Sequence, residues 1–125
     1  MKKAQALASL IIFVAIAITV ITATIIIVGS NTVTATISQQ MVQVRQAAES
    51  GLENALLRLL RDPSYSGETI PANVNGFETT ISVTGDDINK TIISTAANNN
   101  YQRKIKVKIN YNENIMTVNF WQDIQ

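Results

Sequence analysis

Residues 6–28 read ALASLIIFVAIAITVITATIIIV, an almost purely apolar run inside a longer stretch, residues 5–44, that has no charged side chain. As an α-helix this run would be about 35 Å long, and the hydrocarbon core of a bilayer is about 30 Å thick. Because lipid offers no partner to an unpaired backbone group, a lone segment that crosses it must be helical. The sequence therefore predicts a transmembrane helix over residues 5–28.

The charges around this run predict its orientation. Lys2 and Lys3 are the only charged residues before Arg45, so the positive-inside rule places the N-terminus in the cytoplasm and the later residues outside the inner (cytoplasmic) membrane. The run is longer than the apolar region of an ordinary secretory signal, and Gly29-Ser30 is a weak cleavage site. A retained or specially processed span is therefore favoured over ordinary cleavage.

A helical pattern continues beyond the span, through residues 29–61. Arg58 and Arg61 suit the negative end of a helix dipole, and Asp62-Pro63 ends the pattern. The sequence predicts one helix of about 57 residues, from Gln5 to Arg61, with an amphipathic second half. Its apolar positions recur at steps of three and four residues, at Met41, Val44, Ala48, Leu52, Ala55, Leu56 and Leu59.

Residues 62–125 change to the period of two that is typical of strands. In the clearest segment, residues 101–111, the apolar side chains of Ile105, Val107 and Ile109 alternate with lysines. Turn-forming Gly, Asn and Asp residues separate the segments. We expect an α+β fold, a four-stranded antiparallel sheet covered on one face by the amphipathic half of the helix. The four predicted strands fall within residues 77–83, 88–96, 101–111 and 115–121.

This order of elements resembles that of type IV pilin-like proteins, in particular the minor pilins and pseudopilins. Residues 2–13, KKAQALASLIIF, resemble a class III signal peptide, which a prepilin peptidase cleaves on the cytoplasmic side of the apolar run. Residues 47–56, AAESGLENAL, are similar to the Ala-Glu-x-Gly-x-Glu-x-Ala stretch of a minor-pilin branch. The likeness covers the first 60 or so residues, and the sheet is similar only in kind.

The resemblance implies a leader over residues 1–4, cleavage between Ala4 and Gln5, and N-methylation of Gln5. Residues 5–28 would then pack against the same helix of other pilin subunits in a filament. The family usually has Gly and Phe at the positions of Ala4 and Gln5, and Glu at the position of Ser9. That Glu is thought to pair with a neighbouring N-terminal amine, and a serine hydroxyl carries no such charge. Ser9 therefore indicates either a subunit that departs from the standard self-assembly contact, such as a tip or minor component, or a lineage with different rules.

Small residues recur every four positions at Ala47, Gly51 and Ala55, which permits close approach of another backbone. Two interpretations stay open for this face: an assembly contact with the helix of a neighbouring subunit, or packing against the chain's own sheet. The triplet Gly29-Ser30-Asn31 likewise indicates either a helical hinge or polar residues at the headgroup boundary.

Four basic residues gather in one predicted strand, namely Arg103, Lys104, Lys106 and Lys108. Such a cluster can bind nucleic-acid phosphates or acidic cell-surface polymers. Lysines on a strand face also guard against edge-to-edge aggregation. Loss of the leader would leave about eight basic against nine acidic side chains, so nucleic-acid binding is the less favoured interpretation.

The sequence offers little for catalysis, because it has no histidine and no cysteine and no glycine-rich phosphate loop or metal-ligand spacing. We therefore expect no enzymatic activity, no cofactor and no metal site. The predicted function is that of a minor structural subunit of a type IV pilus or related filament. The alternatives are a permanently membrane-anchored surface-binding module and a type II secretion pseudopilin.

Overall fold

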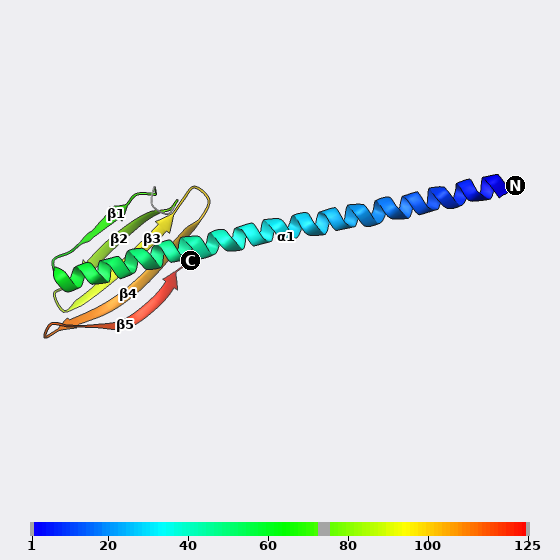
Figure 1. Ribbon diagram of the computed structural model, residues 1–125. Helices are drawn as coiled ribbons and strands as arrows, with labels where there is room; N and C mark the ends of the chain where they lie inside the picture. Colours follow the sequence, from blue (N-terminus) through cyan, green and yellow to red (C-terminus); the bar gives the residue numbers. More distant parts are fainter. Residues whose placement is uncertain (1, 73–75, 125) are drawn as a thin grey trace. The chain divides into compact units, whose positions relative to one another are not determined.

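The computed structural model describes residues 2–72 and 76–124, so the predicted leader is described from Lys2 onward and Met1 lies outside the described residues. One helix, α1 (Lys2–Arg61), precedes a five-stranded antiparallel sheet (Figure 1). The chain divides between Ser38 and Gln39 into two compact units. The N-terminal unit contains helix only, and the second unit, called the head below, contains residues 39–61 of α1 and the sheet.

The sheet is an antiparallel meander in which neighbours in sequence are neighbours in space, in the order β1-β2-β3-β4-β5. Its strands are β1 (Gly67–Ile70), β2 (Glu78–Gly85), β3 (Asn89–Ala97), β4 (Gln102–Asn112) and β5 (Ile115–Ile124). The α+β class, the long helix and the last four strands were predicted. The predicted count of four strands was wrong, because β1 adds a fifth. Its four residues are too few to show a period of two.

Turn chemistry sets the connections between strands. Gly85, with φ of 121°, ends β2, and the carboxylate of Asp86 accepts hydrogen bonds from the backbone N–H groups of Ile88 and Asn89. Glu113 and Asn114 have φ of 51° and 64° and form a two-residue link between β4 and β5. Positive φ at both central residues is the geometry that matches the twist of a two-stranded hairpin.

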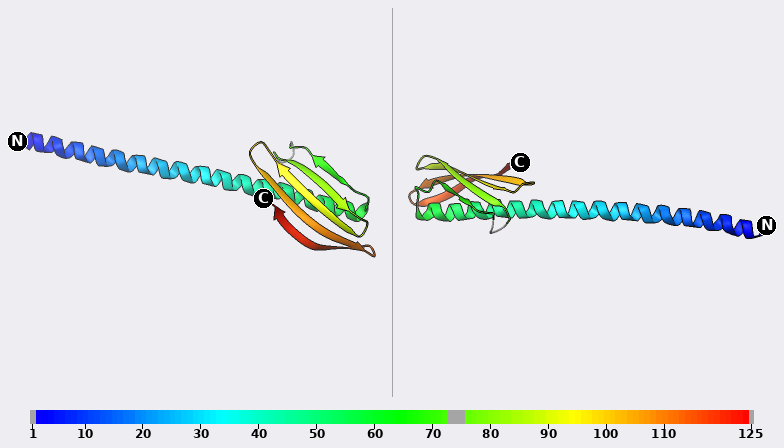
Figure 2. Two further views of the ribbon diagram at one scale, coloured as in Figure 1. Left: turned by 180° about the vertical axis from the view of Figure 1, so that it is seen from behind. Right: turned by 90° about the horizontal axis from the view of Figure 1, so that it is seen from above.

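The hydrophobic core of the head lies between α1 and one face of the sheet. Residues 39–61 of α1 cross that face, as the view from above shows (Figure 2). The helix contributes Val44, Ala47, Ala48, Leu52, Ala55 and Leu59, and the strands contribute Ile81, Ile92, Ala96, Ile105, Val107 and Ile109. Phe77, just before β2, completes this core. The buried residues occur at every second position along their strands, so they all lie on the face of the sheet that packs against the helix. The other face, called the outer face below, points away from the helix.

Candidate assembly and binding surfaces

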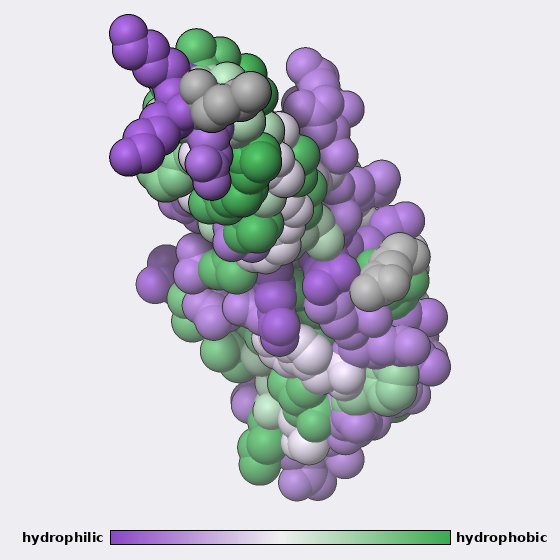
Figure 3. Space-filling view, turned by 90° about the vertical axis from the view of Figure 1, so that its right-hand side faces the viewer, coloured by the Kyte–Doolittle hydropathy of each residue, from purple (hydrophilic) through white to green (hydrophobic). Residues whose placement is uncertain are grey.

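The N-terminal unit presents an apolar surface that the chain itself does not cover. From Lys2 to Gln39 the described side chains are exposed, apart from a half-buried Ala17. Phe13 is 71% exposed and Ile25 is 67% exposed. Figure 3 shows the apolar side chains around this helix at the end nearest the viewer. The helix is long and apolar enough to cross a membrane.

Hydroxyl groups in this segment are satisfied within the helix. Ser9 Oγ donates to the carbonyl oxygen of Gln5 at 3.0 Å, and Thr19, Thr22 and Thr24 each donate to the carbonyl four residues earlier at 2.8–2.9 Å. A hydroxyl bonded in this way carries little cost of burial in an apolar environment. The surface of residues 6–28 can therefore lie in lipid or pack against other apolar helices.

The residues of the predicted processing site lie in the first turns of α1. Ala4 and Gln5 are helical and exposed, and the carbonyl of Gln5 is the acceptor for Ser9. The first four N–H groups of a helix have no partner within it, so such a terminus opens more easily than the interior. The bond between Ala4 and Gln5 therefore lies in the part of α1 that frays most easily.

The small-residue face at Ala47, Gly51 and Ala55 is buried against the chain's own sheet, which is the second of the two interpretations above. Ala47 is 4% exposed and Ala55 is fully buried. A Cβ atom at Gly51 would lie 2.5 Å from Thr79 Cγ2 and 3.0 Å from Ser94 Oγ. The three residues thus let helix and sheet approach closely within one head, and in this structure they offer no surface to a neighbouring helix.

A buried hydrogen bond fixes this close approach, and the sequence analysis did not identify it. Ser94 is fully buried, and its Oγ donates to the carbonyl oxygen of Ala48 at 2.7 Å. A serine between Ile92 and Ala96, at a position where the strand pattern calls for an apolar residue, was the available signal. The bond links the middle of β3 to the middle of the helical segment.

The basic cluster splits between the two faces of β4. Arg103 lies on the helix side with its Nε 3.3 Å from Asp123 Oδ2, and its side chain is only 16% exposed. Lys104, Lys106 and Lys108 lie on the outer face, as the alternation predicted. Arg103 therefore belongs to an ion pair at the end of the core and does not share the surface of the three lysines.

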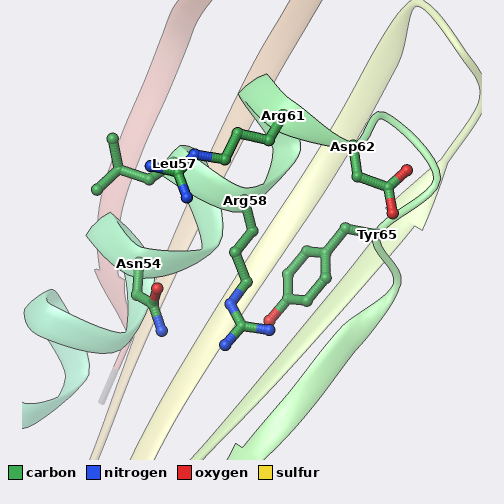
Figure 4. A pocket seen from close by; sticks show the side chains of 6 residues that line it. All are labelled: Asn54, Leu57, Arg58, Arg61, Asp62 and Tyr65. Atoms are coloured by element: carbon green, nitrogen blue, oxygen red, sulfur yellow. The ribbon is translucent and has the colours of Figure 1, made fainter.

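A shallow hollow at the C-terminal end of α1 contains the remaining polar cluster (Figure 4). The guanidinium of Arg58 lies 3.3 Å from Glu68 Oε2 and 5.6 Å from the centre of the Tyr65 ring, and Asn54 Nδ2 donates to Glu68 Oε1 at 3.3 Å. Burial and then the negative charge of Glu68 raise the pKa of Tyr65. These contacts join the helix end to β1. The hollow is lined by Asn54, Leu57, Arg58, Arg61, Asp62 and Tyr65.

In residues 2–72 and 76–124, no three acidic, histidine or cysteine side chains gather as a metal-ion site would require. None of the family models, curated proteins or solved structures with which the chain was compared matches it. The class of protein is therefore described by its architecture alone. A long N-terminal apolar helix continues into a segment that packs on an antiparallel sheet. This architecture is pilin-like.

Proposed function

We propose that the chain is a minor structural subunit of a type IV pilus or a related pilin-like filament. The observation that carries the proposal is the contrast within α1: residues 39–61 complete the core of a small head, whereas residues 6–28 are apolar and have no partner in the described chain. A head that is folded without the span allows the span to exchange lipid contacts for helix contacts without exposing apolar surface to water.

The proposed route begins in the inner membrane, with the N-terminus in the cytoplasm and the head outside. A prepilin peptidase would remove residues 1–4 and leave Gln5 as the new N-terminus, where N-methylation would follow. The spans of several subunits would then pack together as the core of an extracellular or periplasmic filament. Ser9 is already bonded to Gln5 and has no charge to offer a neighbouring amine, which is consistent with a minor position.

N-terminal peptide mass spectrometry on native cells tests this function, by comparing membranes with sheared extracellular filaments. We expect a peptide that begins at Gln5, with or without an added methyl group, in the filament fraction. An intact terminus confined to membranes would instead favour the permanently anchored surface-binding module. A Gln5 terminus in a periplasmic fraction that depends on the secretion machinery would favour a type II secretion pseudopilin.

A charge in the span provides a second test. Ile16 lies in the middle of the apolar run, and a charged side chain there costs about 2.5–3.5 kcal/mol on the insertion scale. Ile16→Asp should strongly reduce both membrane insertion and filament incorporation, measured by carbonate extraction and by immunoblot of the sheared fraction. Ile16→Leu, the matched control, should behave as the wild type. Normal incorporation of Ile16→Asp would contradict the proposed packing.

A further inference from the structure

The outer face of the sheet carries a straight row of three positive charges. Lys104, Lys106 and Lys108 alternate along β4 with the buried Ile105 and Val107. Side chains two residues apart on a strand are about 7 Å apart, so the three ammonium groups span about 14 Å. Like charges at this spacing repel one another.

The residues beside this lysine row do not neutralise it. Across the register, Lys104, Lys106 and Lys108 face six neutral residues, three on β3 and three on β5. Among the described residues none of the three lysines forms an ion pair, although opposite charges across strands would have been stabilising. The six neighbours are Thr91, Ile93 and Thr95 on β3, and Phe120, Gln122 and Ile124 on β5.

Protection of a sheet edge does not explain the lysines either. β4 is an interior strand, and each of the three lysines is paired on both sides, whereas the edge strands β1 and β5 contain no lysine. Guard lysines are needed on edges. The row therefore places like charges together with only the contact between Lys108 and the Phe120 ring to offset them among the described residues, and such places are where binding sites are expected.

The surrounding chemistry indicates the kind of ligand. Hydroxyl side chains surround Ile93 on this face of β2 and β3, with Thr80 opposite Thr95 and Thr84 opposite Thr91. Single-stranded nucleic acids need aromatic side chains on which bases can stack. Of the six residues opposite the lysines only Phe120 is aromatic, and Lys108 Nζ lies 5.7 Å from the centre of its ring. One ring is too few for a series of stacked bases, which makes a nucleic acid the less suitable ligand. A face of lysines and hydroxyls suits a polymer that carries both negative charges and hydroxyl groups.

We propose that the outer face of the head binds an acidic polysaccharide, with Lys104, Lys106 and Lys108 contacting successive carboxylates and the threonines of β2 and β3 contacting sugar hydroxyls. This inference concerns the ligand of the head and is independent of whether the chain enters a filament. The binding should weaken with added salt, because the contacts are exposed to solvent.

Binding is measured with the full chain in a non-ionic detergent, with fluorescent polygalacturonate as the probe and neutral dextran as the control polymer. The triple variant Lys104→Gln, Lys106→Gln, Lys108→Gln should lose about tenfold or more in affinity. The triple Lys→Arg variant should retain binding. A matched charge control, Arg45→Gln with Arg61→Gln and Lys3→Gln, removes the same charge elsewhere and should lose less than about threefold. Equal losses in the Gln variant and this control would overturn the proposal.

A footprint on the unaltered protein makes the test independent of how the variants fold. Polygalacturonate should protect Lys104, Lys106 and Lys108 from acetylation at least about threefold more than Lys2, Lys3 or Lys90. Equal labelling of all lysines with and without polymer would overturn the site. Tighter binding of oligo(dT) or duplex DNA than of polygalacturonate, at the same salt concentration, would overturn the proposed class of ligand and point to a nucleic acid.

Discussion

Residues 2–38 and 39–61 belong to one helix, α1, but the two segments differ in whether the chain itself buries their apolar side chains. The later segment buries its apolar stripe against the sheet of the same chain, and Val44, Leu52 and Ala55 are fully buried. In the earlier segment, residues 6–28 are apolar all around and leave that surface to their environment. A helix that is apolar on one stripe finds its partner within its own domain, and one that is apolar all around needs lipid or other helices.

The first way to test this comparison is to remove a buried side chain from the later segment. Leu52 is fully buried, so Leu52→Ala should lower the free energy of unfolding of the head by about 2–5 kcal/mol. Leu57→Ala removes the same atoms from a residue that is 60% exposed and should cost less than about 0.5 kcal/mol. Urea unfolding of the full chain in detergent, followed by Trp121 fluorescence, measures both. Equal effects would mean that the helix does not pack on the sheet as described.

A glycine pair gives a sharper test, because one substitution should have opposite effects in the two segments. Gly51→Ala would place a Cβ atom 2.5 Å from Thr79 Cγ2, and overpacking of a core typically costs about 1–3 kcal/mol. Alanine is the better helix former by up to about 1 kcal/mol, so we expect a net loss of about 1–2 kcal/mol. Gly29 has no atom within 4 Å of such a Cβ, so Gly29→Ala should only strengthen the helix.

Segment-resolved hydrogen exchange of the two variants separates these effects. Gly29→Ala should slow exchange around residue 29 and leave the head unchanged. Gly51→Ala should speed exchange in β2 and β3. Thr79→Ser, combined with Gly51→Ala, should recover part of the loss, because it removes the Cγ2 atom that would lie 2.5 Å from the new Cβ atom. Faster exchange around residue 29 in Gly29→Ala would contradict the expected gain in helix propensity.

Much of this architecture could be predicted from periodicity alone. The apolar run, the helical stripe through Leu59 and the alternation in β4 each extend over several repeats, which makes their periods clear. β1 could not be found, because Gly67–Ile70 is four residues long and depends on pairing with β2 and on the contacts of Glu68. The sequence also could not show what packs against the face at Gly51, because small residues at this spacing suit both the chain's own sheet and a neighbouring helix. Arg103 directly precedes Lys104, so the alternation of the strand already places it on the face opposite the three lysines.

Low pH should distinguish the N-terminal unit from the head, and this is the smallest of the expected effects. Residues 2–38 contain no Asp or Glu, whereas in the head the backbone N–H groups of Asn89 and Ile88 hold the pKa of Asp86 below its ordinary value. A lowered pKa in the folded state means that the stabilisation is present above the unfolded pKa and is lost as the pH falls through the folded one, here below about pH 4. Between pH 7 and pH 3, the protection factors for hydrogen exchange, which correct for the pH dependence of the intrinsic rate, should therefore fall in the β2–β3 turn and stay unchanged in the N-terminal helix in micelles. Asp86→Asn should flatten this acid response, and Asp87→Asn, which leaves the two hydrogen bonds in place, should keep it. An equal response in both variants would mean that the turn does not set the acid sensitivity of the head.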